Sequence, residues 1–169
     1  MDAALWGFIG TLAGAVVGAT ASISTTAISS RNASRLQQNS NYLERIERAR
    51  AFQRDNLLEL QDTLQDCMRL MGRAHHEDVV AYRESGHWGK SMLSDEVNQN
   101  TLLSNRKLAM LTERVSDNEL RSELKKFSNN SSNLLFAKSE IESDESLKIA
   151  SSEFSSIMEK LGEVLRKNY

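Results

Sequence analysis

Apolar and polar residues follow two different patterns along this chain, and the patterns meet near residue 31. From Ala3 to Ser30 no residue carries a charge, and large apolar residues are mixed with glycine, alanine, serine and threonine. A helix of about 20 apolar residues crosses the hydrocarbon core of a bilayer. The pattern therefore favours a single transmembrane helix over residues 1–30.

Two other interpretations of this segment stay open. A cleaved signal peptide fits the triplet Ala19, Thr20 and Ala21, which resembles a cleavage site, although the start carries Asp2 where a basic residue is usual. A helix buried in a soluble assembly fits the many small residues, which also allow close packing in water. In either case the chain would have no lasting membrane span.

Three glycines in the uncharged segment recur at a spacing of four. Gly10, Gly14 and Gly18 are followed at the same spacing by Ser22 and Thr26, and residues four apart share one side of a helix. Close backbone approach over small residues supplies the dispersion contacts that hold membrane helices together. We expect Gly10, Gly14, Gly18 and Ser22 to form a self-association surface. The alternative is a plain anchor whose glycines have no such role.

Positive charges follow the uncharged segment at once. Arg31 and Arg35 come directly after it, whereas Asp2 is the one charged side chain before it. The positive-inside rule then places the C-terminal part of the chain in the cytoplasm, as a single-pass protein. Both arginines are also predicted to contact anionic lipid headgroups.

From Leu36 onward the apolar residues recur at helical spacing. A run of eight falls on heptad seam positions: Leu43, Ile46, Leu57, Leu60, Leu64, Cys67, Met71 and Ala74. Arg50 and Gln53 interrupt the same seam, which favours a helical stalk over residues 31–56 that is either solvated or joined in a loose oligomer. Gly86 and Gly89 end the pattern.

Three shorter helices are predicted after this break, over 95–115, 117–142 and 144–167. Ser94 is the predicted N-cap of the first, the run Ser116–Glu119 resembles a capping box for the second, and Ser143 or Asp144 caps the third. The run SNNSSN at 128–133 is weak helix material. Short connections favour antiparallel neighbours. The predicted fold is all-α: a transmembrane helix, a long stalk helix and an antiparallel four-helix bundle over 57–169.

Composition agrees with long helices and with a reducing compartment. The 169 residues include no proline and one cysteine, and aromatic residues make up 6%. Cys67 has no internal partner for a disulfide, as is usual in the cytoplasm. The net charge of −2 indicates no affinity for nucleic acid.

No motif for catalysis, cofactor binding or metal binding occurs in the sequence. Phosphate-binding loops, GxGxxG, HExxH and CxxC are all absent, so we expect neither an enzyme nor a cofactor. His75 and His76 are adjacent, whereas helical metal ligands are usually three or four residues apart, so a structural or solvated role is expected. Trp88 lies between two glycines and either contacts a partner or covers the end of the bundle core.

Two stretches carry a resemblance to a group of known proteins. LWGFIGTLAGAVVGA, at residues 5–19, precedes ERIERARAFQRDNLLELQDTL, at residues 44–64. This arrangement resembles small bacterial and phage-borne proteins in which a glycine-rich N-terminal span precedes an arginine-rich helical body. The resemblance implies location in a bacterial inner membrane and implies no activity.

Two classes of function fit these patterns. The first is a membrane-anchored protein that forms a homo-oligomer through its glycines and binds a protein partner through the bundle. The second is a membrane-permeabilising effector or pore, whose transmembrane helices oligomerise under control of the cytoplasmic part. The glycine spacing favours association of membrane helices in both.

Overall fold

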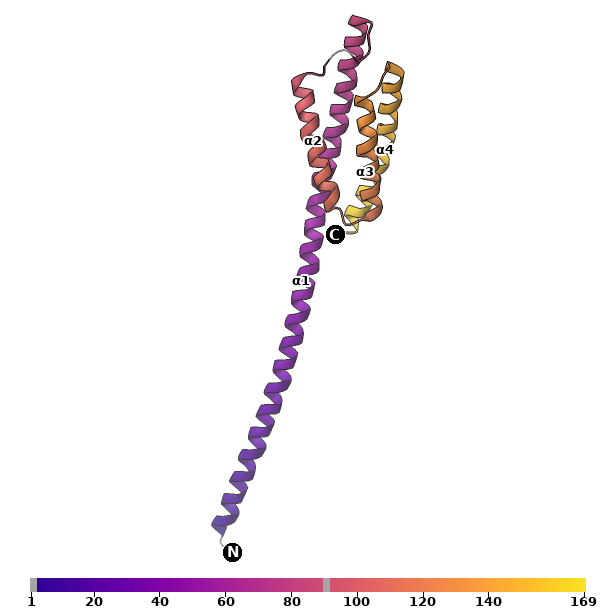
Figure 1. Cartoon of the computed structure of the whole chain (residues 1–169). Coiled ribbons are helices and arrows are strands. Elements are labelled where there is room, and N and C mark those ends of the chain that lie inside the picture. Colours follow the sequence, from indigo (N-terminus) through magenta and orange to yellow (C-terminus); the bar gives the residue numbers. More distant parts are fainter. Residues whose placement is uncertain (1–2, 90–91) are drawn as a thin grey trace. The chain divides into compact units, whose positions relative to one another are not determined.

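All regular structure that the computed structural model describes is helical. It describes residues 3–89 and 92–169, with side chains of the first helix from Trp6 onward. Its elements are α1 (Ala3–Ser85), α2 (Asp95–Arg114), α3 (Asn118–Leu135) and α4 (Glu140–Arg166) (Figure 1). The predicted all-α class is confirmed. Residues 1–2 of the predicted membrane segment and residues 90–91 of the α1–α2 connection lie outside the described residues.

The chain divides into two units. The first is Met1–Arg48, and the second is Ala49–Tyr169. The first unit holds the N-terminal part of α1, and the second holds the rest of α1 together with α2, α3 and α4. The boundaries predicted at residues 30 and 56 stay predictions.

One hydrophobic core fills the second unit. The seam of α1 predicted from heptad spacing is buried from Leu57 to Ala74, so this part of the prediction is confirmed. Helices α2, α3 and α4 contribute further buried apolar residues to this core: Val97, Leu108, Leu111, Leu120, Leu124, Phe127, Leu134, Ala150, Ile157, Leu161 and Val164. Burial of these side chains is the main force that holds the four helices together.

The helices run antiparallel to their neighbours. Arg73 of α1 pairs with Glu96 of α2 at 2.8 Å. Nearer the start of the bundle, Glu59 of α1 pairs with Lys107 at 3.0 Å. From residue 59 to residue 73 of α1, the contacting residue of α2 moves back from 107 to 96. Helices α1 and α2 are therefore antiparallel.

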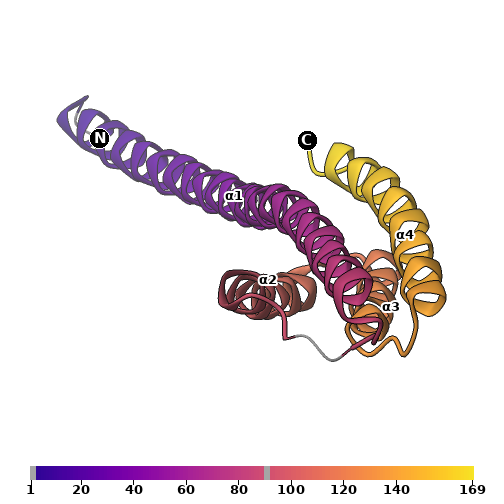
Figure 2. The same ribbon diagram turned by 90° about the horizontal axis from the view of Figure 1, so that it is seen from above.

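Helix α4 packs against the other side of α1 and is also antiparallel to it. His75 lies 3.1 Å from Asp144, and Arg54 donates a hydrogen bond to the Asn168 carbonyl at 2.7 Å. Helix α3 packs against both α2 and α4. Seen along the bundle, α2 and α4 lie on opposite sides, with α1 and α3 between them (Figure 2).

The connection after α1 follows the sequence prediction. Gly86 and Gly89 both have φ of 71°, a conformation that favours glycine. Ser94 is the N-cap of α2 as predicted, and its hydroxyl accepts a hydrogen bond from the Val97 amide at 3.4 Å. The carboxylate of Glu77 in turn accepts hydrogen bonds from the amide and the hydroxyl of Ser94.

The boundary between α3 and α4 differs from the prediction. Helix α3 ends at Leu135 instead of residue 142, and Ser139 is the N-cap of α4 instead of Ser143 or Asp144. The hydroxyl of Ser139 accepts a hydrogen bond from the Glu142 amide at 3.2 Å. A serine followed three residues later by a glutamate is itself a capping-box pattern, which the sequence interpretation overlooked.

The weak helix material at 128–133 lies inside α3. Ser131 and Ser132 each donate a hydrogen bond to the Ser128 carbonyl, so their hydroxyls are satisfied within the helix. Asp117 rather than Ser116 caps the start of α3, because the Asp117 carboxylate accepts from the Leu120 amide at 2.9 Å.

Candidate functional site

The first candidate site is the N-terminal part of α1. The beginning of this helix is long and apolar enough to cross a membrane, by length and composition. Every side chain that the structure describes between Trp6 and Arg45 is exposed, including Trp6, Phe8, Leu12 and Val16. An apolar surface of this kind on a soluble monomer would face water along its whole length. The segment is therefore a candidate membrane anchor.

The glycines form one smooth face of this helix. A Cβ atom added at Gly10, Gly14 or Gly18 would meet nothing within 4 Å. At about 100° per residue the bulky side chains of Leu12 and Val16 lie on the opposite side. The helix thus has a smooth face and a bulky apolar face. Ser22 continues the smooth face and is exposed, and self-association through this face stays a prediction.

The threonine hydroxyl groups in the same segment are satisfied by the helix itself. Thr20 donates to the Val16 carbonyl at 2.9 Å. Thr25 donates to the Ala21 carbonyl, and Thr26 donates to the Ser22 carbonyl, both at 2.9 Å. Because each threonine proton is already bonded, these residues can lie in hydrocarbon without an unsatisfied donor.

The arginines that follow the segment lie on exposed positions of α1. Arg31 and Arg35 are both exposed, so their guanidinium groups are accessible to lipid headgroups. Their predicted contact with headgroups stays a prediction.

Trp88 joins two connections at one end of the bundle. Its indole nitrogen donates to the carbonyl of Ala137, in the α3–α4 connection, at 2.9 Å. Its ring meets Tyr82 edge-on, with centroids 5.7 Å apart. The side chain is half-buried. These contacts agree with the interpretation that Trp88 covers the end of the core, and its contact with a partner stays a prediction.

Polar residues of α1 hold the other end of the bundle. Gln53 donates to the Arg114 carbonyl and accepts from the Ser116 amide, both at 2.9 Å, and so fixes the α2–α3 connection. Asn56 donates to the Leu111 carbonyl at 3.2 Å. Gln53, which lies within the predicted stalk, therefore makes contacts within the bundle.

One serine, one histidine and one aspartate meet between α1 and α4. Nδ1 of His75 lies 2.9 Å from the Ser143 hydroxyl, and Nε2 lies 3.1 Å from Asp144. A nucleophilic serine must be reachable by substrate, but Ser143 has 0% exposure. The trio therefore joins two helices and is not suited to nucleophilic catalysis.

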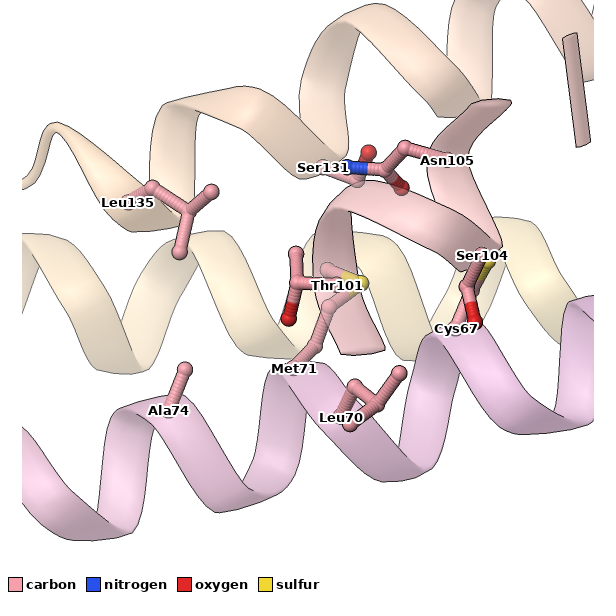
Figure 3. A pocket seen from close by; sticks show the side chains of 9 residues that line it. All are labelled: Cys67, Leu70, Met71, Ala74, Thr101, Ser104, Asn105, Ser131 and Leu135. Carbon is pink, nitrogen blue, oxygen red and sulfur yellow. The ribbon is translucent and has the colours of Figure 1, made fainter. Parts of the chain in front are cut away.

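Cys67 lies beside a small cavity between α1, α2 and α3 (Figure 3). The cavity has a volume of about 10 Å³, and Thr101, Ser104 and Ser131 line it with Cys67. This is room for about one water molecule, whereas small-molecule sites measure about 300 Å³ or more. Burial raises the pKa of the Cys67 thiol to about 12, and the Asp66 carboxylate adds to the shift.

Metal ligands do not gather in the described part of the chain. Among residues 3–89 and 92–169, no group of three or more histidine, cysteine, aspartate or glutamate side chains is placed to hold an ion. His76 is exposed, and both ring nitrogens of His75 already contact other side chains, those of Ser143 and Asp144.

Comparisons of the chain with protein-family models, with curated proteins and with solved structures found no match.

Proposed function

We propose that the protein is a non-enzymatic, membrane-anchored helical bundle. It crosses a bacterial inner membrane once, with the bundle in the cytoplasm, and it needs no cofactor. It self-associates through Gly10, Gly14, Gly18 and Ser22, and the bundle binds a protein partner. The observation that carries the proposal is the exposed, uncharged helix between Trp6 and Ser30.

Self-association is supported by the contrast between the two faces of this helix. A neighbouring helix can approach the backbone at Gly10, Gly14 and Gly18, where no side chain intervenes. The bulky residues on the other face, such as Leu12 and Val16, are left for the lipid tails. Arg31 and Arg35 at the end of the span support the cytoplasmic orientation.

A permeabilising effector is the alternative function. The residues that favour this alternative are Ser22, Thr25 and Thr26, which carry hydroxyl groups in the second half of the span. The threonine protons are bonded to backbone carbonyls of the same helix, which supports an anchor over a water-filled pore. Leakage of a dye from vesicles separates the two functions.

The test of the glycine face uses a cysteine at the end of the span. Cys67→Ser removes the native thiol, and Ser29→Cys places one thiol per chain, so a crosslink in membranes reports that two spans are neighbours. Gly14→Ile should abolish this crosslink, because its branched side chain fills the smooth face. Gly14→Ala should weaken it less, because alanine is still small.

Ala19→Ile is the matched control, since Ala19 lies about 140° from Gly14 around the helix. It adds a similar side chain outside the glycine face and should leave the crosslink unchanged. If Gly14→Ile crosslinks as well as the unsubstituted span, the segment is a plain anchor. An effector would cause dye leakage that Gly14→Ile removes, whereas the proposed anchor causes none.

A further inference from the structure

Helix α2 carries an apolar and basic face that nothing in the described chain covers. Leu102, Leu103 and Met110 are exposed, Leu103 by 63%. Arg106 lies between them, one helical turn from each. In the described residues Arg106 is exposed and makes no salt bridge, whereas neighbouring Lys107 pairs with Glu59. We call Leu102, Leu103, Arg106 and Met110 the α2 face.

Helix α4 carries an exposed face of the opposite charge at mid-length. Ile149 is exposed by 53%, and Ser152, Ser155 and Glu159 are exposed on the same side of the helix. Glu159 makes no salt bridge within the described residues, whereas neighbouring Lys160 pairs with Glu119. We call Ile149, Ser152, Ser155 and Glu159 the α4 face.

The two faces overlap in height along the bundle. Glu59 pairs with Lys107 and Arg73 with Glu96, which sets the level of α2 against α1. Because all α-helices rise equally per residue, Arg106 lies level with about residue 60 of α1.

The level of α4 follows from its own contacts with α1. His75 pairs with Asp144, and Arg54 bonds to the Asn168 carbonyl. By the same rise, Glu159 lies level with about residue 62 of α1 and Ser155 level with about residue 65. Arg106 and Glu159 are therefore at nearly the same height, and so are Leu103 and Ser155.

The charge of Lys148 agrees with the same register. Lys148 is exposed on α4 and lies level with the first turn of α2, which carries Asp95 and Glu96. Glu145, one turn before Lys148, is also exposed, and the first turn of α4 carries Glu140 and Glu142. The charge match between the two faces therefore rests on Arg106 and Glu159 at mid-length. Complementary charges of this kind fix register between partners.

We propose that a second copy of this chain occupies these faces, with α2 of one copy packed against α4 of the next. The proposal rests on the proposed membrane anchor, because the anchor concentrates the copies in one membrane with their bundles on the same side. Since α2 and α4 lie on opposite sides of the bundle (Figure 2), each copy binds two neighbours. Such head-to-tail contacts build a ring or an open row of bundles.

The test is thiol crosslinking of the full chain in its membrane, on a Cys67→Ser background. Leu103→Cys and Ser155→Cys are made singly and together, and a short bis-maleimide is added. The double variant should give a ladder of dimers, trimers and larger species, because each copy then offers one thiol on each face. Each single variant should stay almost entirely uncrosslinked.

Charge reversal tests the pairing of Arg106 with Glu159. In the double-cysteine chain, Arg106→Glu and Glu159→Arg should each lower the crosslinked fraction by about fivefold. Arg106→Glu combined with Glu159→Arg should restore the ladder. Glu84→Arg is the matched control, because Glu84 is exposed on α1 outside both faces, and it should change nothing.

The other outcomes overturn the proposal. Dimers from either single-cysteine variant would mean that two copies meet through a symmetric contact. Adducts with other proteins would mean that a different protein occupies the faces. Absence of a ladder from the double variant would mean that α2 and α4 of neighbouring copies do not dock. Failure of the proposed function is recorded separately by membrane fractionation and by the Ser29→Cys crosslink. A ladder that persists with Gly14→Ile supports the bundle contact even where the glycine contact is lost.

Discussion

Cys67 shows how its surroundings decide the chemistry of a single side chain. It lies in the buried seam of α1, and burial raises the pKa of its thiol to about 12. The thiolate is the reactive form of cysteine, and at pH 8 nearly all of the folded protein carries the neutral thiol. We expect a maleimide or a disulfide reagent to label native Cys67 slowly and the unfolded chain rapidly, as measured by mass spectrometry over time.

The same shift predicts a dependence of stability on pH. The unfolded thiol ionises near pH 9 and the folded thiol near pH 12, so the unfolded state loses its proton first. The contribution of Cys67 to stability is fully present below pH 9 and is lost as pH rises from 9 to 12. In the Cys67→Ala variant this contribution to the dependence of stability on pH should be absent. Rapid labelling of the native protein at pH 8 would show that the thiol is not buried as described.

The N-caps of α3 and α4 decide where these helices begin. Asp117 accepts from the Leu120 amide, and Ser139 accepts from the Glu142 amide. Asp117→Ala and Ser139→Ala should each lower the free energy of unfolding by about 0.5–2 kcal/mol, because each leaves an amide at a helix start without its partner. Chemical denaturation measures the change.

Ser122→Ala is the control for the cap variants, since Ser122 is an exposed residue in the first half of α3. It should change stability by less than about 0.5 kcal/mol. If Ser139→Ala behaves like this control, Ser139 does not contribute to the start of α4.

Elements with a strong local pattern were predicted correctly from sequence. Leu57, Leu60 and Leu64 fall on the buried face because helical spacing alone sets that face, and the same geometry aligns the glycines of the candidate anchor. The α3–α4 boundary was predicted wrongly because Ile141 continues the apolar spacing past the end of α3. In the structure Ile141 belongs to α4 and is exposed, since hydrogen bonding at Ser139 outweighs the spacing.

Contacts between helices were beyond the reach of the sequence. The meeting of His75 with Ser143, and of Gln53 with the α2–α3 connection, depends on how far each helix is offset from its neighbour. Spacing within one helix carries no information on that offset. For this reason Gln53 was predicted to lie in a stalk outside the bundle, although its amide bonds to two backbone groups of the bundle.

At the scale of the whole molecule, the two units differ in where their apolar side chains lie. Every buried residue among the described side chains, from Asn56 to Val164, belongs to the second unit, and the described side chains of the first unit are almost all exposed. Stability of the bundle should therefore not depend on the first 48 residues. We expect a chain of residues 49–169 to fold without detergent, with helical circular dichroism and one cooperative thermal transition.

The full chain should need detergent or membranes, because its first unit exposes an uncharged helix, yet its bundle should melt near the same temperature as residues 49–169. Leu124→Asp in the shorter chain is the control for cooperativity: it puts a charge without a partner into the core and should abolish the transition. A shorter chain that unfolds gradually, or that melts far below the full chain, would mean that residues 1–48 contribute to the folded core.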